Sequence, residues 1–330
     1  MNTRKIAGVP VSAIGVGAMS FAEFYGPTTE ENSWAVLDAA LDAGVTHIDT
    51  SNVYGMGRSE RAIGAYLNKT PEARDVFHIA TKAGITKDAE GNRCFRNDLA
   101  HLEAELDGSL ERLGVEAVDL FYVHRRDETM PIEEVTEALV ALKQKGKIKA
   151  FGFSEIAPSS LRRACAVAPV AAVQNEYSLA SRAVELGMIQ ECARQDVALV
   201  AFSPVGRAFL TDTPIPQDRA MGLAWMKANP RFQSPNYEAN IAASDRFRAL
   251  AAEMGVPAAA LAIAWLLARG EHVIPIPGTR SVSHFRECLR GADMTLTEGD
   301  LARIEEVLPV GWAHGDRYST AQYIGPERYS

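Results

Sequence analysis

The sequence predicts an α/β protein in which eight parallel strands close into a (β/α)8 TIM barrel, preceded by a β-hairpin. Three observations favour this fold. Short apolar, β-branched runs alternate along the chain with longer stretches of helical periodicity. The short connections between them are typical of parallel strands covered by helices. There are eight such strand–helix units, which favours a closed barrel over an open sheet.

The order of the predicted elements follows from these runs and from the residues that bound them. Thr28 or Thr29 can cap the first helix, Gly44 can end it, and Asn97 or Asp98 can cap a later helix whose leucines recur at helical spacing. The predicted strands lie near Ala13–Ala18, Thr46–Asp49, Val76–Lys82, Leu120–His124, Ala150–Ser154, Ala172–Asn175, Leu199–Ser203 and Val273–Pro277. The predicted helices are Thr29–Ala43, Ser59–Leu67, Asn97–Leu113, Ile132–Lys145, Ser159–Val167, Glu185–Gln195, Pro257–Ala268 and Ser281–Gly291.

We expect a single domain over residues 1–330, because no linker or repeat separates a second one. Within residues 1–15, the segment Arg4–Ile14 is typical of a hairpin placed to plug the bottom of the barrel. Residues 207–241 are rich in Pro, Asp and Asn and too long for an ordinary loop. They follow the seventh strand, on the face where barrels build active sites, so we predict a functional lid there. Residues 309–330 form a C-terminal tail.

The composition argues against several classes of protein. A formal net charge of −8 disfavours a general nucleic-acid binder, since phosphate contacts need clustered Lys and Arg. The longest uncharged stretch, Met254–Ala268, is too short to span a bilayer, and no secretory signal is visible. Four cysteines without CxxC spacing are expected to be free thiols in a reducing compartment. We expect a cytoplasmic monomer or small homo-oligomer with no nucleic-acid or membrane partner.

Four titratable residues follow consecutive predicted strands. Asp49 ends the second strand, Tyr54 lies in the loop after it, Lys82 ends the third and His124 ends the fourth. Each alone could cap a turn, face solvent or pack in a wall. Barrel enzymes place their chemistry at the carboxyl ends of strands, so we expect the four side chains to converge there.

These side chains suit the reduction of a carbonyl group, which needs a proton donor for the developing alkoxide. A tyrosine phenol can donate, with an unperturbed pKa of about 10. We expect the Lys82 ammonium to lower the pKa of Tyr54, and Asp49 to keep Lys82 charged and oriented. His124 can hydrogen-bond the substrate oxygen and fix its approach.

The segment GVTHIDTSNVYGMGRSERAIGAYL (Gly44–Leu67) resembles the signature of the aldo-keto reductase superfamily. The segments IATKAG, VDLFYVHRRD, GKIKAFGFSE, VQNEYSL, AFSPVGRAFL and VIPIPGTR follow in the order and spacing of that family. The resemblance covers roughly residues 4–318. It implies a metal-free oxidoreductase that transfers hydride from NADPH to a small aldehyde or ketone, with Asp49, Tyr54, Lys82 and His124 as its catalytic residues.

The resemblance also implies a cofactor site. It places Ser154 and Gln174 on the nicotinamide carboxamide, which wants one donor and one acceptor, and the ring of Phe202 on the nicotinamide. Glycine loops that open helices bind anions, which favours NADP through Arg280 and its neighbours. The full predicted set is Gly17, Ala18, Met19, Ser154, Gln174, Phe202, Ser203, Gly206, Arg207, Gly278, Thr279, Arg280, His284, Glu287 and Cys288. The sequence departs from the family at Glu155 and Cys288, where asparagine is frequent, and at Ala208, where glycine is common.

Gly15–Ser20 is nearly a GxGxxG motif, but no helix opens at its end as a dinucleotide fold requires, so we reject that interpretation. The substrate pocket is expected to be lined by Phe21, Tyr25, Arg125, Trp225 and Trp312, with Arg126 and Tyr318 as further candidates, and Arg125 or Arg126 could attract an anionic substrate. Two alternatives stay open. One is a barrel lyase or aldolase that uses Lys82 as a Schiff base. The other is a regulatory subunit that binds nicotinamide without turnover.

Overall fold

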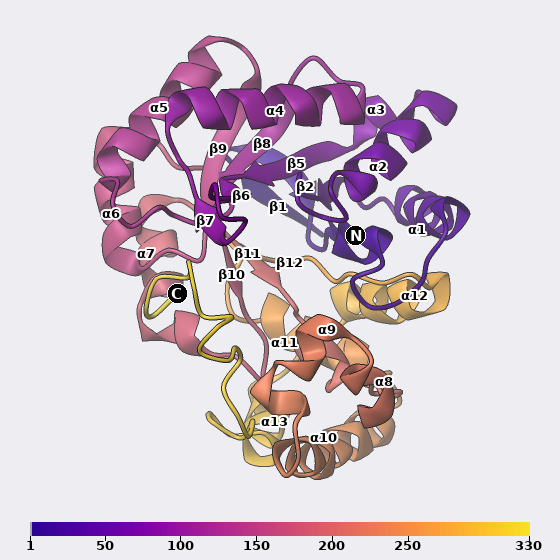
Figure 1. Ribbon diagram of the computed structural model, residues 1–330. Helices are drawn as coiled ribbons and strands as arrows, with labels where there is room; N and C mark the ends of the chain where they lie inside the picture. The colour runs from indigo at the N-terminus through magenta and orange to yellow at the C-terminus, as the bar shows by residue number, and fades with distance from the viewer. Residues whose placement is uncertain (1) are drawn as a thin grey trace.

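A curled sheet of eight parallel strands forms the centre of the protein in the computed structural model, which describes residues 2–330 (Figure 1). The neighbouring order is β3-β4-β5-β8-β9-β10-β11-β12, so each strand lies beside the next parallel strand along the chain. All eight predicted strands are confirmed. Their bounds are Val16–Gly17 (β3), His47–Asp49 (β4), His78–Ala83 (β5), Val118–Val123 (β8), Ile148–Ser154 (β9), Ala172–Glu176 (β10), Ala198–Phe202 (β11) and Val273–Pro275 (β12).

Glycines bring the first and last strands together. The amides of Gly15 and Gly17 donate to the carbonyls of Pro275 and Pro277 at 2.9 and 3.0 Å. A Cβ on Gly17 would lie 2.7 Å from the carbonyl oxygen of Ile276, so a larger residue would push the two segments apart. The glycines of the rejected GxGxxG motif therefore serve to close the sheet.

Helices surround the sheet, as the alternating sequence pattern predicts (Figure 1). Thr29 caps α1 by accepting from the Asn32 amide at 3.2 Å, and Asp98 caps α4 through the His101 amide at 3.0 Å. The helix predicted at Glu185–Gln195 is divided at Gly187. The helices that match predictions are Glu30–Asp42 (α1), Arg58–Lys69 (α2), Leu99–Leu113 (α4), Ile132–Gln144 (α5), Pro158–Val167 (α6), Met188–Gln195 (α7), Ala258–Leu267 (α11) and Val282–Arg290 (α12).

The N-terminal hairpin pairs β1 (Thr3–Ile6) with β2 (Val9–Ser12). Its turn has positive φ at Ala7 and Gly8, 50° and 80°, as tight two-residue hairpin turns require. Ile6 and Val11 are buried in one apolar cluster with residues of the barrel strands, including Tyr122. The amide of Ser12 donates to Thr46, just before β4, so the hairpin covers the amino ends of the strands.

The segment after β11 differs from the irregular lid that we expected. It contains a 3₁₀ turn at Gly206–Ala208 (η3), short helices at Gln217–Met221 (α8) and Ala224–Lys227 (α9), and a second 3₁₀ turn at Pro230–Phe232 (η4). From residue 236 it already belongs to the long helix α10 (Asn236–Glu253). The prediction of a continuous loop is therefore wrong, because helices of four or five residues are too short to show a period.

Other elements without a sequence prediction are the 3₁₀ turns η1 (Ala18–Ala22) and η5 (Gly291–Asp293), α3 (Ala73–Val76), α13 (Glu298–Val307) and the hairpin of β6 (Ile85–Lys87) and β7 (Arg93–Phe95). The turn η1 opens within the GxGxxG-like motif, where we expected no helix, but it is a short 3₁₀ turn and not the α-helix of a dinucleotide fold. Helices α8, α9, α10 and α13 gather on one side of the barrel, and the C-terminal tail runs from there across the strand ends (Figure 1). Within residues 2–330, no single helix is long and apolar enough to span a membrane. Only α10 and α11 taken together meet that criterion, across a bend of 89°.

Candidate active site

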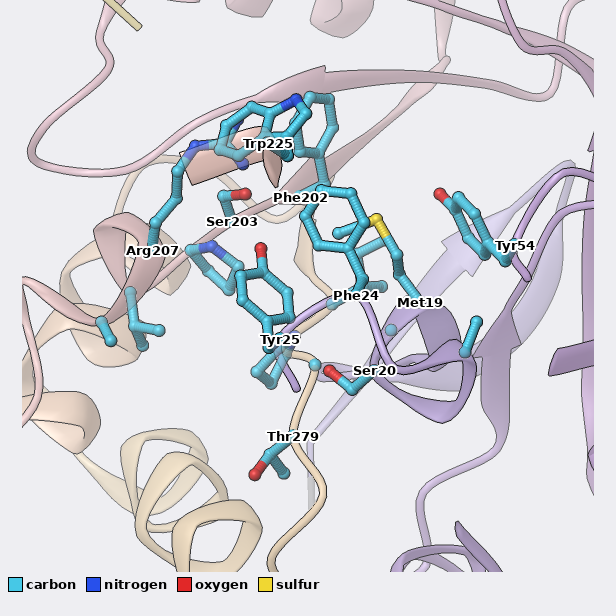
Figure 2. Close-up of a pocket in the computed structure, with 18 of the residues that line it drawn as sticks. Met19, Ser20, Phe24, Tyr25, Tyr54, Phe202, Ser203, Arg207, Trp225 and Thr279 are labelled. Atoms are coloured by element: carbon cyan, nitrogen blue, oxygen red, sulfur yellow. The ribbon is translucent and has the colours of Figure 1, made fainter. Parts of the chain in front are cut away.

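A cavity of about 710 Å³ opens at the carboxyl ends of the strands. It extends from Tyr54 past Met19 and Phe202 to Ser203, Arg207 and Thr279 (Figure 2). Residues of the sequence-predicted site that line it are Gly17, Met19, Tyr25, Asp49, Tyr54, His124, Arg125, Ser154, Gln174, Phe202, Ser203, Arg207, Trp225, Gly278, Thr279, Arg280, His284, Glu287 and Cys288. One cavity therefore brings together most of the residues that the sequence singled out.

Other predicted residues lie outside the cavity wall. Phe21 is 1% exposed within the main apolar core, and the indole nitrogen of Trp312 donates to the Leu179 carbonyl at 2.8 Å. Their prediction as substrate walls is wrong, because both side chains pack inward. Ala18 is also fully buried and Gly206 lies behind the wall, so their placement directly on a cofactor is not supported.

An ion pair between Asp49 and Lys82 forms the floor of the site. The Lys82 ammonium donates to Asp49 Oδ1 and, at 2.8 Å, to the carbonyl of Thr50. Gln174 Nε2 donates to Asp49 Oδ2 at 2.7 Å. Burial raises the pKa of Asp49 and lowers the pKa of Lys82, while their mutual attraction opposes both shifts. Lys82 has no exposed surface and stands behind Asp49 as seen from the cavity.

Tyr54 lies above this ion pair. The Lys82 Nζ is 5.2 Å from the centre of the Tyr54 ring, and the ring meets His124 edge-on at 5.7 Å between centroids. Burial raises the pKa of Tyr54, the Asp49 charge raises it further, and Arg125 opposes both. We expected the Lys82 ammonium to lower this pKa, but the net shift is upward, and burial is its largest cause. The phenol is accordingly protonated at neutral pH.

His124 is held by a residue that the sequence analysis missed. Its Nδ1 lies 3.0 Å from the hydroxyl of Ser51, two residues after Asp49. The pKa of His124 falls well below its usual value, first because of burial and then because of the charges of Arg125, Lys82 and Arg93. The imidazole is therefore neutral. The sequence offers one weak indication that Ser51 belongs to the site, because it lies between Asp49 and Tyr54 in the segment Gly44–Leu67.

Ser154, at the end of β9, is the register partner of Gln174 in the middle of β10. The hydroxyl of Ser154 donates to the Gln174 carbonyl at 2.9 Å and accepts from Arg125 Nη1 at 3.0 Å. Since Gln174 also donates to Asp49, these predicted carboxamide partners are connected through Gln174 to the Asp49–Lys82 ion pair.

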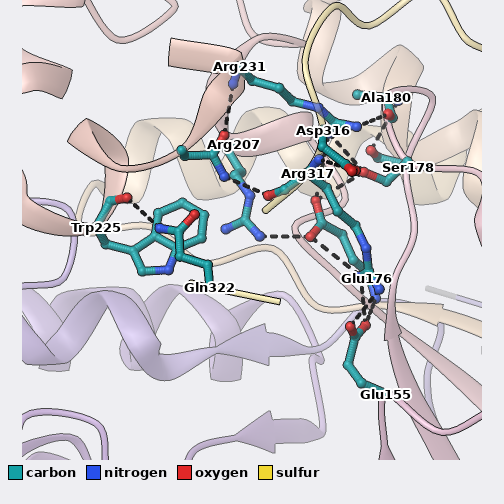
Figure 3. A network of polar contacts seen from close by, with 12 residues as sticks. Glu155, Glu176, Ser178, Ala180, Arg207, Trp225, Arg231, Asp316, Arg317 and Gln322 are labelled. Carbon is teal, nitrogen blue, oxygen red and sulfur yellow. Dashed lines mark hydrogen bonds and ion pairs between the residues drawn. The ribbon is translucent and has the colours of Figure 1, made fainter. Parts of the chain in front are cut away.

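The charge of Arg207, which the sequence analysis places in the cofactor site, is compensated inside the protein. Its guanidinium pairs with Glu176 at 2.7 Å and lies 4.1 Å from the ring centre of Trp225 (Figure 3). Backbone φ is positive at Ser203, Arg207 and Ala208, 52°, 56° and 75°, so the loop after β11 is tightly wound. Arg207 thus fixes the wall of the cavity between strand and lid.

Two arginines meet at the far end of the cavity. Arg280 donates to the carbonyl of Pro27, and Arg219, from α8 in the lid, donates to the carbonyl of Tyr25 at 3.4 Å. A Cβ on Gly26 would lie 3.3 Å from Arg280 Nη1 and 3.4 Å from Arg219 Nη2. Within residues 2–330 neither arginine forms an ion pair. Burial, and next the charge of Arg219, lowers the pKa of Arg280.

These adjacent cations lie near the first turn of α12, whose N-cap Ser281 accepts from the His284 amide at 3.4 Å. The free amides of a first helical turn favour anions, and two unpaired guanidinium groups add to that preference. The far end of the cavity is therefore suited to a phosphate group. Sequence reasoning found Arg280 but missed Arg219, which lies in no motif.

Comparisons with known proteins agree with this geometry. The model of the Aldo/keto reductase family matches residues 13–309. The aldo-keto reductase yakc of Schizosaccharomyces pombe, whose name includes NADP(+), is 37% identical over 96% of this chain and 94% of its own length. Probable aldo-keto reductase 1 of Glycine max is 35% identical over 98% and 92%.

Solved structures are similar as well. A glycerol dehydrogenase from Gluconobacter oxydans is 30% identical, with a TM-score of 0.81 over 93% of this chain and 94% of its own. An aldo-keto reductase from Bacillus halodurans in its holo form has a TM-score of 0.76 over 98% and 99%, at 22% identity. The second likeness concerns the fold alone.

Proposed function

Because the chain belongs to the aldo/keto reductase family, we propose that it reduces an aldehyde or ketone to the alcohol, or the reverse, with NADPH as cofactor and Tyr54 as general acid/base. Membership of this family supports NAD(P)H-dependent carbonyl reduction as the activity of the chain. The observation that carries the finer proposal is the meeting of Tyr54, His124 and the Asp49–Lys82 pair at one end of the cavity.

The residues of the cavity fit such a cofactor. The arginines at the far end, Arg280 and Arg219, form a cationic site for the adenosine 2′-phosphate, which supports NADPH over NADH. At the other end, Ser154 and Gln174 would hold the carboxamide, beside the ring of Phe202. When bound, the nicotinamide supplies a hydride to the carbonyl carbon.

Tyr54 supplies the proton. Its raised pKa keeps the phenol protonated, so it can donate to the oxygen on which negative charge develops. If Ser51 donates to His124 Nδ1, the proton of the neutral imidazole is on Nε2, where it can hydrogen-bond the same oxygen. Asp49 holds Lys82 in place beneath the ring, and the Lys82 ammonium provides the positive charge that favours the phenolate as it forms.

The alternatives gain no support from these contacts. A Schiff base needs a lysine amine that substrate can reach, whereas Lys82 is fully buried between Asp49 and the Thr50 carbonyl. A regulatory role without turnover has no feature in its favour, since Asp49 contacts Lys82, Lys82 lies near the Tyr54 ring, and that ring lies near His124.

The test is NADPH oxidation across a panel of aldehydes and ketones, repeated with NADH and with Tyr54→Phe. We expect turnover with NADPH and a loss of roughly 10²-fold or more in kcat for Tyr54→Phe, since acid/base catalysis contributes about 10²–10⁴. Near-normal turnover by the variant would refute the role of Tyr54. NADPH binding without turnover on any carbonyl would refute the reductase proposal.

A further inference from the structure

Arg125 differs from the other buried arginines of this protein. Among residues 2–330, the arginines classed as buried are Arg125, Arg126, Arg207, Arg231 and Arg317. Four of them have a carboxylate oxygen within 4.0 Å, at Glu327, Glu176 or Glu155. Arg125, which is 8% exposed and lines the cavity, has none. A buried charge without a partner is costly, so this exception calls for an explanation.

The hydrogen bonds of Arg125 leave part of its guanidinium unused. Nη1 donates to the His124 carbonyl at 2.6 Å and to the Ser154 hydroxyl at 3.0 Å. Nε is buried and has no partner within the described residues. Burial opposes the lowering of the Glu155 pKa, to which Arg317 and then Arg125 contribute, but this carboxylate is held by Arg317 at 2.8 Å and accepts a hydrogen bond from the Glu176 amide. The internal contacts therefore orient Arg125 without neutralising it.

The adjacent residue, Arg126, has its charge compensated by a carboxylate, unlike Arg125. It pairs with Glu327 of the C-terminal tail at 2.6 Å and donates to the Met130 carbonyl. Of the two arginines that the sequence offered for an anionic substrate, Arg126 is thus committed to the fold, whereas Arg125 faces the cavity beside His124.

A second cation faces the same space. Arg93 belongs to β7 of the β6–β7 hairpin, lines the cavity and forms no ion pair among residues 2–330. Its guanidinium carbon lies 5.3 Å from the ring centre of Phe95, which steadies the side chain. The charges of Arg125 and Arg93 are close enough that each contributes to the environment of His124. Like charges converge this way where an anion is to be attracted.

We propose that the substrate is a short carbonyl compound bearing an oxyanion, a carboxylate or a phosphate, which Arg125 binds directly and Arg93 attracts. This inference rests on the proposed reductase function and names its substrate class. Since Arg125 contacts Ser154 and adjoins His124, the oxyanion would lie near the reacting carbonyl. Short oxo-acids or short phosphorylated aldehydes meet that condition.

The experiment compares matched probes with the full-length enzyme and NADPH. One arm uses 4-oxobutanoate and its methyl ester, and the other uses glyceraldehyde 3-phosphate and glyceraldehyde. We expect kcat/KM to favour the anionic member of at least one pair by about 10-fold or more, in line with a charge-assisted contact. The arm with the larger preference identifies the carboxylate or the phosphate as the recognised group.

The variants Arg125→Met, Arg125→Lys and Arg93→Met are compared by the ratio of anionic to neutral kcat/KM, which a general loss of activity does not move. We expect the ratio to fall about 10-fold in Arg125→Met, to be partly kept in Arg125→Lys and to fall less in Arg93→Met. Arg96→Met is the control: it lies near the same hairpin, pairs with Asp98 outside the cavity and should leave the ratio unchanged.

Equal rates for anionic and neutral probes in the wild type, or an unchanged ratio in Arg125→Met, would overturn this inference while leaving the reductase proposal intact. No turnover of any of the four probes, together with none across the wider carbonyl panel, would instead remove the reductase proposal on which it rests.

Discussion

The paired arginines at the far end of the cavity lead to a prediction about cofactor choice. Arg219→Ala and Arg280→Ala should each weaken NADPH binding and leave NADH binding nearly unchanged. The two guanidinium groups flank Gly26 at 3.4 and 3.3 Å from its Cβ position, so one phosphate can contact both. NADH lacks the 2′-phosphate and makes no such contact.

The size of the effect follows from the kind of contact. A hydrogen bond to a charged group contributes about 1.5–3 kcal/mol, which corresponds to roughly 10- to 150-fold in Kd. Because both arginines would bind the same group, their effects should not be additive, and the double variant should lose less than the sum of the single losses. Without ligand the two like charges repel, so neither variant should lower the Tm of the free protein.

The assay is titration of NADPH and NADH by quenching of protein fluorescence, with thermal unfolding of the free protein measured alongside. Arg246→Ala on α10 is the control, since this arginine is exposed, lies outside the cavity and forms no ion pair among residues 2–330. Equal weakening of NADPH and NADH, or unchanged NADPH affinity in both single variants, would refute the phosphate site.

Three further predictions concern Tyr54, Ser51 and the buried histidine pair at the amino ends of β4 and β5. Because the raised pKa keeps Tyr54 protonated, kcat for reduction should be flat from about pH 6 to 8, whereas alcohol oxidation, which needs the phenolate, should rise steadily with pH; a reduction rate that falls across this range would contradict the assignment. Ser51→Ala should lower kcat roughly 10-fold, part of the 10²–10⁴ of acid/base catalysis, with NADPH Kd unchanged, and an unchanged kcat would show that His124 is positioned without Ser51. Burial lowers the pKa values of His47 and His78 in the folded protein, so below the histidine pKa of about 6.5 the unfolded chain binds more protons than the folded one. We therefore expect Tm to fall as the pH drops below that value, and to fall less steeply in His78→Asn. An equally steep fall in that variant would exclude this pair of histidines as the cause.

The barrel itself was predictable because its signal is local. Several interior strands contain a short apolar run that is buried on both faces, as Leu120–Val123 of β8 (Val118–Val123) is, and such runs stand out in the sequence. The missing elements lack that signal. α10 packs different faces against several partners and shows little amphipathic pattern, while the strands of the β6–β7 hairpin have three residues each.

The site was predictable where a strand end fixes the residue and unpredictable where distant segments meet. Asp49 and His124 follow buried strands, so the fold class alone brings them to one face. Arg219 reaches Tyr25 across 194 positions, and nothing in either local sequence indicates the contact. The direction of the Tyr54 pKa shift was misjudged because burial is its largest cause, and the sequence does not show how deeply a loop tyrosine is buried.

The buried ion cluster beside the cavity links the end of β10, the segment 207–241 and the C-terminal tail. The Glu176 carboxylate pairs with Arg207 at 2.7 Å and lies 3.8 Å from the guanidinium of Arg317 in the tail (Figure 3). This one carboxylate therefore joins the turn after β11 to the C-terminal tail. The tail also reaches the lid, because Gln322 Nε2 donates to the Trp225 carbonyl at 2.8 Å.

Buried ion pairs contribute little net stability, since desolvation offsets most of their attraction. Their directional contacts nevertheless fix which segments meet. Trp225 stacks on the guanidinium of Arg207, a residue that is 6% exposed, so α9 and the 3₁₀ turn after β11 are held against each other. Because the tail hydrogen-bonds the carbonyl of the same Trp225, loss of the Arg207–Glu176 pair is expected to loosen both the segment 207–241 and the tail.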